Sequence, residues 1–245
     1  MKTRENENIK TKNAGENALG TLYVVATPIG NLEDITMRAL RVLSEVSLVL
    51  CEDTRHSKIL LSHYEIKTKT ESYHAHSNDA KMKNIAERLA GGESLALISD
   101  AGTPLISDPG SPLLSYLRKQ FGSELKVVPI PGASALTAAL SVIPVPGGRF
   151  TFLGFLPHKK GRQTVIKKMK EAEDAQVCYE SSHRIVKLMG ELMEFYPEAH
   201  VWIARELTKQ FEEILEGTPA ELKSLLESKP EKQKGEFVVV VSNQQ

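Results

Sequence analysis

Four segments of the sequence combine polar side chains with Gly or Pro, and each directly follows an apolar run of strand length. The segments are TPIGN at 27–31, CEDTR at 51–55, DAGTPLISDPG at 100–110 and PGASA at 131–135. In open α/β sheets, ligands bind beyond the carboxyl ends of the strands. Each segment alone could be only a turn or a helix cap. Together, four such segments favour a shared ligand-binding cleft.

The sequence lacks the common nucleotide and metal fingerprints. It contains neither GxxxxGK[ST] nor GxGxxG, and Leu136 stands where a GxSxG nucleophile elbow around Ser134 would need glycine. It has no HExxH motif, and Cys51 and Cys178 lie far apart, so we predict no metal site. These features disfavour a phosphate-cradling loop and a metallohydrolase.

Strands and helices alternate along the chain in a way that would bring the four segments to one edge of a sheet. In the first half, apolar runs predict strands at 22–26, 47–51, 95–99 and 125–130, with helices after them. This alternation predicts a mostly parallel sheet covered on both faces. Residues 143–149 are dense in Pro and Gly and are typical of a linker.

A second alternating set follows the linker, with strands at 150–155, 176–180, 200–204 and 237–241. We therefore predict an α/β protein with two α/β domains. The domains would span residues 21–143 and 150–245, after a flexible N-terminal extension at 1–20.

Composition and charge narrow the class of protein further. Of the 245 residues, 41% are hydrophobic and 25% are charged, which is ordinary for a globular protein. The 31 basic and 31 acidic residues cancel, so any contact with nucleic acid needs a local basic patch. We find no apolar run that would span a membrane and no secretory signal, and we expect a cytoplasmic protein.

Such a basic patch occurs just after the predicted strand at 150–155. It contains His158, Lys159, Lys160, Arg162, Lys167, Lys168 and Lys170, with no acid before Glu171. A solvated helix face could explain the last three lysines. The absence of interspersed acids favours instead a local anionic partner, with RNA phosphate as our hypothesis.

Eight segments, taken together and in order, resemble a known enzyme family. They are TLYVVATPIGNLEDIT, CEDTRHS, SDAGTPLISDPG, PGASA, FLGFLPHKKGR, YESSHR, ARELTK and KGEFVVVV, and they span about Gly20 to Val241. The family is that of bacterial 16S ribosomal RNA ribose 2′-O-methyltransferases, which modify a cytidine of the decoding centre. It falls within the tetrapyrrole-methylase-like superfamily.

The resemblance implies a tetrapyrrole-methylase-like fold with S-adenosylmethionine in the cleft between the two domains. It also implies a homodimer that acts on 16S ribosomal RNA, within the 30S subunit. Matched to the family, the cofactor-binding residues are Pro28, Ser99, Asp100, Ala101, Thr103, Ser134, Ala135, Glu180 and Leu207. Tetrapyrrole members carry a Gly-rich first loop and Gly-Asp-Pro at the donor loop, whereas this chain has TPIGN and Ser-Asp-Ala. That departure favours an RNA substrate.

The implied reaction is an in-line attack of the ribose 2′-oxygen on the donor methyl group. A free hydroxyl is a poor nucleophile, so a base or an orienting group should help. The candidates are Asp100, Glu180, Asp53 and Lys209, and the sequence does not choose among them. For the RNA we predict contacts from Lys159, Lys160, Arg162 and Arg184, although Arg184 could instead brace an acidic side chain.

Two rival functions remain open at this point. One is methylation of a tetrapyrrole or another small molecule, against which the basic patch counts. The other is a non-catalytic RNA-binding factor in ribosome assembly, against which the intact SDAGTP and PGASA segments count.

Overall fold

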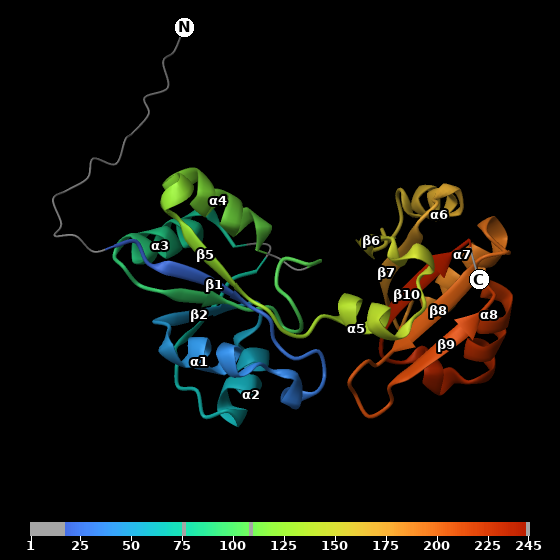
Figure 1. Ribbon diagram of the computed structural model, residues 1–245, viewed down its shortest axis with the longest axis horizontal. Helices are drawn as coiled ribbons and strands as arrows, with labels where there is room; N and C mark the ends of the chain where they lie inside the picture. Colours follow the sequence, from blue (N-terminus) through green and yellow to red (C-terminus); the bar gives the residue numbers. More distant parts are fainter. Residues whose placement is uncertain (1–17, 75–76, 108–109, 244–245) are drawn as a thin grey trace, which may run out of the picture.

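The computed structural model describes residues 18–74, 77–107 and 110–243, which form two five-stranded sheets with helices packed on them (Figure 1). One sheet comes from the N-terminal half of the chain and the other from the C-terminal half. The predicted α/β class is therefore confirmed. Most of the predicted N-terminal extension, residues 1–17, lies outside the described residues. Gly20 is already part of the fold, since its amide donates to the Leu89 carbonyl (2.8 Å).

The first sheet is parallel throughout, in the order β3-β2-β4-β1-β5. Its strands are β1 (Thr21–Val25), β2 (Leu48–Cys51), β3 (Thr70–Ser72), β4 (Leu95–Leu97) and β5 (Lys126–Ile130). Its helices are α1 (Met37–Glu45), α2 (Thr54–His63), α3 (Asp79–Ala90) and α4 (Ser111–Phe121). α1 and α2 cover one face, and α3 and α4 cover the other (Figure 1). Double coverage explains why strands such as β2 are wholly apolar and buried.

The second sheet is mixed, in the order β6-β7-β10-β8-β9. β6 and β7 pair in parallel, whereas β10 is antiparallel to β7 and β8, and β8 is antiparallel to β9. Its strands are β6 (Phe150–Phe155), β7 (Ala175–Ser181), β8 (His200–Arg205), β9 (Glu213–Gly217) and β10 (Glu236–Ser242). One face packs against α6 (Arg162–Glu171), α7 (Ile185–Phe195) and α8 (Pro219–Ser228).

The other face of the second sheet is covered by α5 (Ala135–Val142), which lies between the two sheets in Figure 1. Ala139 of α5 packs with Val177 of β7, Trp202 of β8 and Val238 of β10. The sequence pattern predicts that the first domain ends at residue 143, after this helix. Because the core contacts of α5 are with the second sheet, we propose to place the boundary before the helix instead.

Candidate active site

A pocket of about 450 Å³ lies where the carboxyl-end loops of the first sheet face the second sheet. Its first-sheet wall comes from the loops after β1, β4 and β5. Its second-sheet wall comes from the end of β6, from β7, β8 and β10, and from the residues next to them. Small-molecule sites usually have volumes of roughly 300–1,000 Å³. The pocket is therefore large enough for a ligand and lies where the rule for α/β sheets places one.

Hydrogen bonds tie the three first-sheet loops together. Thr27 and Gly102 exchange two backbone hydrogen bonds, with N···O distances of 2.9 and 3.0 Å. The Thr103 hydroxyl donates to the Ala133 carbonyl (3.1 Å) and so links the loops after β4 and β5. Gly102 has a φ of +78°, and a Cβ there would lie only 3.2 Å from Cγ2 of Ile29. Glycine is favoured at this position by both its backbone conformation and the close neighbour.

Most of the residues predicted to bind the cofactor line this pocket. They are Asp100, Ala101, Thr103, Ser134, Ala135, Glu180 and Leu207. Pro28 and Ser99 are not lining residues. The Ser99 hydroxyl donates to the Ala101 carbonyl (3.1 Å), and the Ser99 carbonyl accepts from the Thr27 hydroxyl (3.3 Å). Buried Ser99 therefore fixes the loop from beneath instead of facing a ligand.

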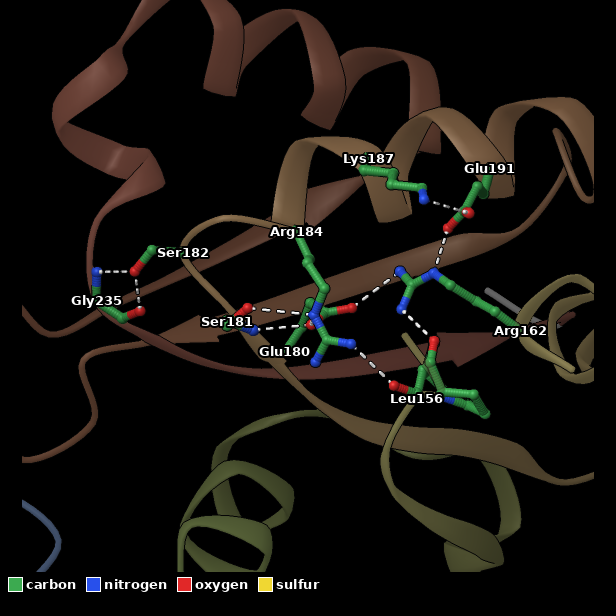
Figure 2. Close-up of polar contacts among 10 residues, drawn as sticks. Leu156, Arg162, Glu180, Ser181, Ser182, Arg184, Lys187, Glu191 and Gly235 are labelled. Atoms are coloured by element: carbon green, nitrogen blue, oxygen red, sulfur yellow. Dashed lines mark hydrogen bonds and ion pairs between the residues drawn. The ribbon is translucent and has the colours of Figure 1, made fainter. Parts of the chain in front are cut away.

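Glu180, near the end of β7, is the centre of a buried network of charges (Figure 2). Its Oε2 accepts from Arg162 Nη2 (2.9 Å), and its Oε1 pairs with Arg184 Nε (2.7 Å). Oε1 also accepts from the Ser181 amide (2.9 Å), and Arg162 Nε donates to Glu191 Oε2 (2.8 Å). Burial lowers the pKa of Arg162, but the hydrogen bonds to the two glutamates outweigh it, and the pKa rises above its usual value.

This network bears on three of the predicted residue roles. The Arg162 side chain is 2% exposed and that of Arg184 is 13% exposed, and both are engaged with Glu180. Their burial and their pairing with Glu180 count against the prediction that these two arginines contact RNA. Glu180 was a candidate base, but its side chain is fully buried and both of its carboxylate oxygens already accept hydrogen bonds. It holds the wall of the pocket and is not free to take a substrate proton.

Two further candidate bases, Asp53 and Lys209, lie outside the pocket lining. Asp53 caps α2, and hydrogen bonds from the Arg55 side chain and backbone lower the pKa of its carboxyl to about 2. Lys209 pairs with Glu206 and Glu236 at 2.9 Å each. Burial lowers the pKa of Lys209, but these carboxylates more than compensate, so its pKa is raised. A weakly basic carboxylate and a lysine held protonated are both poor general bases near neutral pH.

The second-sheet wall contains residues that sequence reasoning missed. The Ser182 hydroxyl donates to the Gly235 carbonyl (2.7 Å) and accepts from the Gly235 amide (3.0 Å), which fastens the turn after β7 to the start of β10 (Figure 2). His183, next in that turn, is exposed and lines the pocket, as do Phe155 and Tyr179. The sequence carries a signal for this turn, because residues 181–184 (SSHR) directly follow the strand predicted at 176–180.

The basic segment after β6 divides into engaged and available cations. Lys167 lies over an aromatic ring at 4.8 Å, and Lys170 faces a carboxylate at 4.0 Å. Lys159 and Lys160 are exposed, and Lys159 lines a second pocket of about 260 Å³ together with Lys187. Lys187 is itself paired with Glu191 (3.8 Å), so it belongs with the engaged cations. Lys159 and Lys160 are available, and these two lysines form the basic surface.

The described part of the chain contains neither a membrane-spanning helix nor a cluster of metal-binding side chains. None of its helices has the length and apolar character needed to cross a membrane. Nor do its His, Cys, Asp and Glu side chains gather anywhere in a group of three or more that could hold a metal ion.

The sequence family described as Tetrapyrrole (Corrin/Porphyrin) Methylases matches residues 21–223, so the chain belongs to this family. Solved structures share the fold. Cobalt precorrin-4 methyltransferase superposes with a TM-score of 0.64 at 15% identity, covering 91% of this chain and 94% of that one. Uroporphyrin-III C-methyltransferase from Thermus thermophilus, complexed with S-adenyl homocysteine, has a TM-score of 0.63 at 17% identity, covering 90% and 97%.

The chain is also similar in sequence to curated proteins named ribosomal RNA small subunit methyltransferase I. The Xylella fastidiosa (strain Temecula1) protein is 45% identical over 224 residues, which cover 91% of this chain and 81% of that one. The Pseudomonas aeruginosa protein is 46% identical over 228 residues, covering 92% and 80%. The Escherichia coli O157:H7 protein is 39% identical over 235 residues, covering 95% and 81%.

Proposed function

We propose that this protein methylates the ribose 2′-oxygen of a cytidine in 16S ribosomal RNA, with S-adenosylmethionine as the methyl donor. The observation that carries the proposal is the identity of 45% over 91% of the chain with a protein named ribosomal RNA small subunit methyltransferase I. The pocket supports it, because most of the residues matched to the donor site from sequence line one cavity.

The chemistry of the pocket fits the donor. When bound, S-adenosylmethionine supplies an electrophilic methyl group on a positively charged sulfur. Asp100 places a carboxylate in the lining, which complements a cation. Ile29, Leu207 and Val238 supply apolar surface for an uncharged portion of the ligand, and Thr103 and Ser134 add hydroxyls. A site of mixed apolar and polar lining is typical for a ligand of this kind.

The chain's own residues would act by positioning. The tied first-sheet loops present Asp100 and Thr103 without rearrangement, and the buried charge network fixes the opposite wall. Holding two reactants at attacking distance supplies a large part of the barrier reduction in such transfers. The remaining requirement is a group that activates or orients the acceptor hydroxyl.

The RNA would be held by the basic surface of Lys159 and Lys160. Phosphate contacts of this kind give affinity and fix the register, whereas contacts to bases give specificity. The family resemblance further suggests a cytoplasmic homodimer that uses the 30S subunit as its substrate. Sedimentation at several protein concentrations tests the dimer, and a concentration-independent monomer mass would contradict it.

One assay tests the proposed function against its rivals. The purified protein is incubated with labelled S-adenosylmethionine and, in parallel, with 30S subunits, naked 16S RNA and a tetrapyrrole precursor. We expect label in the RNA, and mass spectrometry of its nucleosides should show 2′-O-methylcytidine. Transfer to the tetrapyrrole alone would favour a small-molecule methylase. Absence of donor binding in calorimetry would favour a non-catalytic assembly factor.

A further inference from the structure

The turn after β7 carries a histidine that the site described so far leaves without a role. His183 is exposed and lines the 450 Å³ pocket from the second-sheet side, and the Asp100 loop lines it from the first sheet. Within residues 18–74, 77–107 and 110–243, neither a hydrogen bond nor an ion pair engages its imidazole. The ring nitrogens are therefore available to a ligand.

The turn that carries His183 is fixed on both sides. Glu180 accepts from the Ser181 amide (2.9 Å), and Ser182 is fastened to Gly235 by two hydrogen bonds. After His183, Arg184 donates to the Ser181 hydroxyl (3.2 Å) and pairs with Glu180. An exposed side chain on a backbone held this firmly is prepositioned, which is what a group acting on a bound substrate requires.

The other candidates are committed elsewhere. The Glu180 carboxylate is ion-paired with arginines, that of Asp53 with Arg55, and the Lys209 ammonium with two glutamates. Asp100 lines the pocket, but its Oδ1 accepts from the Asp53 amide (3.2 Å), and its negative charge suits the donor. Histidine is the commonest general base near neutral pH.

We propose that His183 is the catalytic residue that accepts the proton of the acceptor hydroxyl, an inference that depends on the methyl transfer to ribose proposed above. The 2′-oxygen forms its bond to the methyl carbon as the carbon–sulfur bond breaks, and the sulfur keeps that electron pair. The hydroxyl proton passes to the imidazole and from there to water. The step needs no reactant beyond the donor and the RNA.

The pH dependence of the reaction is a first test. With a histidine base, the single-turnover rate rises with pH until the imidazole is neutral and is level above that point. The titratable and charged groups around His183 that could also contribute are Asp100, Tyr179, Glu180, Arg184 and Glu236. We expect His183→Ala to remove the rising limb, because a variant without the imidazole cannot gain activity by deprotonating it.

The decisive experiment compares His183→Ala and His183→Gln with wild type in single-turnover methylation of 30S subunits. We expect the rate to fall by about 10²–10⁴-fold in both variants, the range for loss of a general base. Added imidazole should partly rescue the alanine variant. Donor affinity by calorimetry and RNA affinity by filter binding should be unchanged. In NMR, the His183 imidazole signals should shift when S-adenosylhomocysteine and RNA are added together.

His63→Ala is the matched control, because His63 is an exposed histidine at the end of α2 and is not a lining residue. An active wild type with active His183 variants would overturn this inference alone. Full activity in His183→Gln would show that the residue only orients the hydroxyl. Lost donor or RNA affinity in a folded variant would make His183 a binding residue. A wild type inactive on every RNA would overturn the proposed function and this inference with it.

Discussion

The first-sheet wall of the pocket is held by hydrogen bonds between backbone and hydroxyl groups, whereas the second-sheet wall depends on buried charges. Thr27, Gly102 and Thr103 tie the first wall through neutral groups. Glu180 and Arg162 support the second from beneath. A neutral hydrogen bond contributes about 0.5–1.5 kcal/mol, but a buried ion left without its partner costs about 3–5 kcal/mol. The two walls should therefore respond very differently to single substitutions.

The largest effect should come from Glu180→Gln, which removes the negative charge that pairs with the buried Arg162 and the largely buried Arg184. We expect the free energy of unfolding to fall by about 3–5 kcal/mol, as measured by urea denaturation. The control is Glu45→Gln, which removes an exposed pair with Arg41 and should cost less than about 1 kcal/mol. Equal losses in the two variants would show that the network does not support the wall.

A smaller effect, on binding rather than stability, is expected at the first wall. Asp100→Ala should weaken donor affinity about tenfold or more, since losing a hydrogen bond to a charged group costs about 1.5–3 kcal/mol. Asp100→Asn keeps an acceptor for the Asp53 amide but removes the charge. If the charge is what matters, calorimetry should find both variants weakened and both still folded. Unchanged donor affinity in Asp100→Asn would show that Asp100 stabilises its loop and that its charge does not bind the donor.

At the basic surface we expect a moderate, salt-dependent effect. Lys159→Ala combined with Lys160→Ala should lower RNA affinity and flatten its log–log salt dependence by about 1.4–1.8 units, or 0.7–0.9 per lost contact. Arg162 is left out of the variant because its side chain is buried. Lys167 and Lys170, which are engaged with a ring and a carboxylate, provide the control pair. Parallel salt slopes for wild type and the Lys159–Lys160 variant would show that this surface does not contact RNA phosphates.

The smallest effect concerns pH and Asp53. The pKa of this carboxyl is lowered to about 2 by its hydrogen bonds with Arg55, below the ordinary value of about 3.9. Its stabilisation is therefore fully present above pH about 4 and is lost as the pH falls toward 2. Asp53→Asn should be slightly less stable at pH 5, and the difference should close on acidification, as followed by thermal unfolding. Methylation should not change, and a large loss would return Asp53 to the candidate bases.

The sequence predicted the strands that are buried on both faces and the helices between them. Two of the four edge strands, β3 (Thr70–Ser72) and β9 (Glu213–Gly217), escaped prediction, whereas the apolar runs of β5 and β6 predicted the other two. β3 is a polar run of three residues, and β9 is only half buried, so neither has the apolar signal of a central strand. The periodicity of the sequence also did not predict that α5 packs on the second sheet. An amphipathic pattern shows that one face of a helix is buried, but it does not identify the element that buries it.

The sequence predicted the site residues that directly follow a strand. It did not predict the residues whose role depends on side chains that only folding brings close. Most donor-loop residues could be matched because they lie consecutively after one strand. Arg162 belongs to a run of basic residues that resembles a surface patch, and only folding brings Glu180 and Glu191 to it. His183 lies in YESSHR, but nothing in the sequence distinguishes it from the polar residues beside it; only the fold shows that it lines the pocket.

The chain passes from the first sheet to the second only once, between Ile130 at the end of β5 and Ala135 at the start of α5. Ser134 within this crossing lines the pocket, and α5 is anchored on the second sheet. The five Cα–Cα steps from Ile130 to Ala135 reach at most about 18 Å when fully extended. The crossing therefore works as a short tether across the pocket. Two halves joined this way cannot separate further than this crossing reaches without pulling α5 from its sheet.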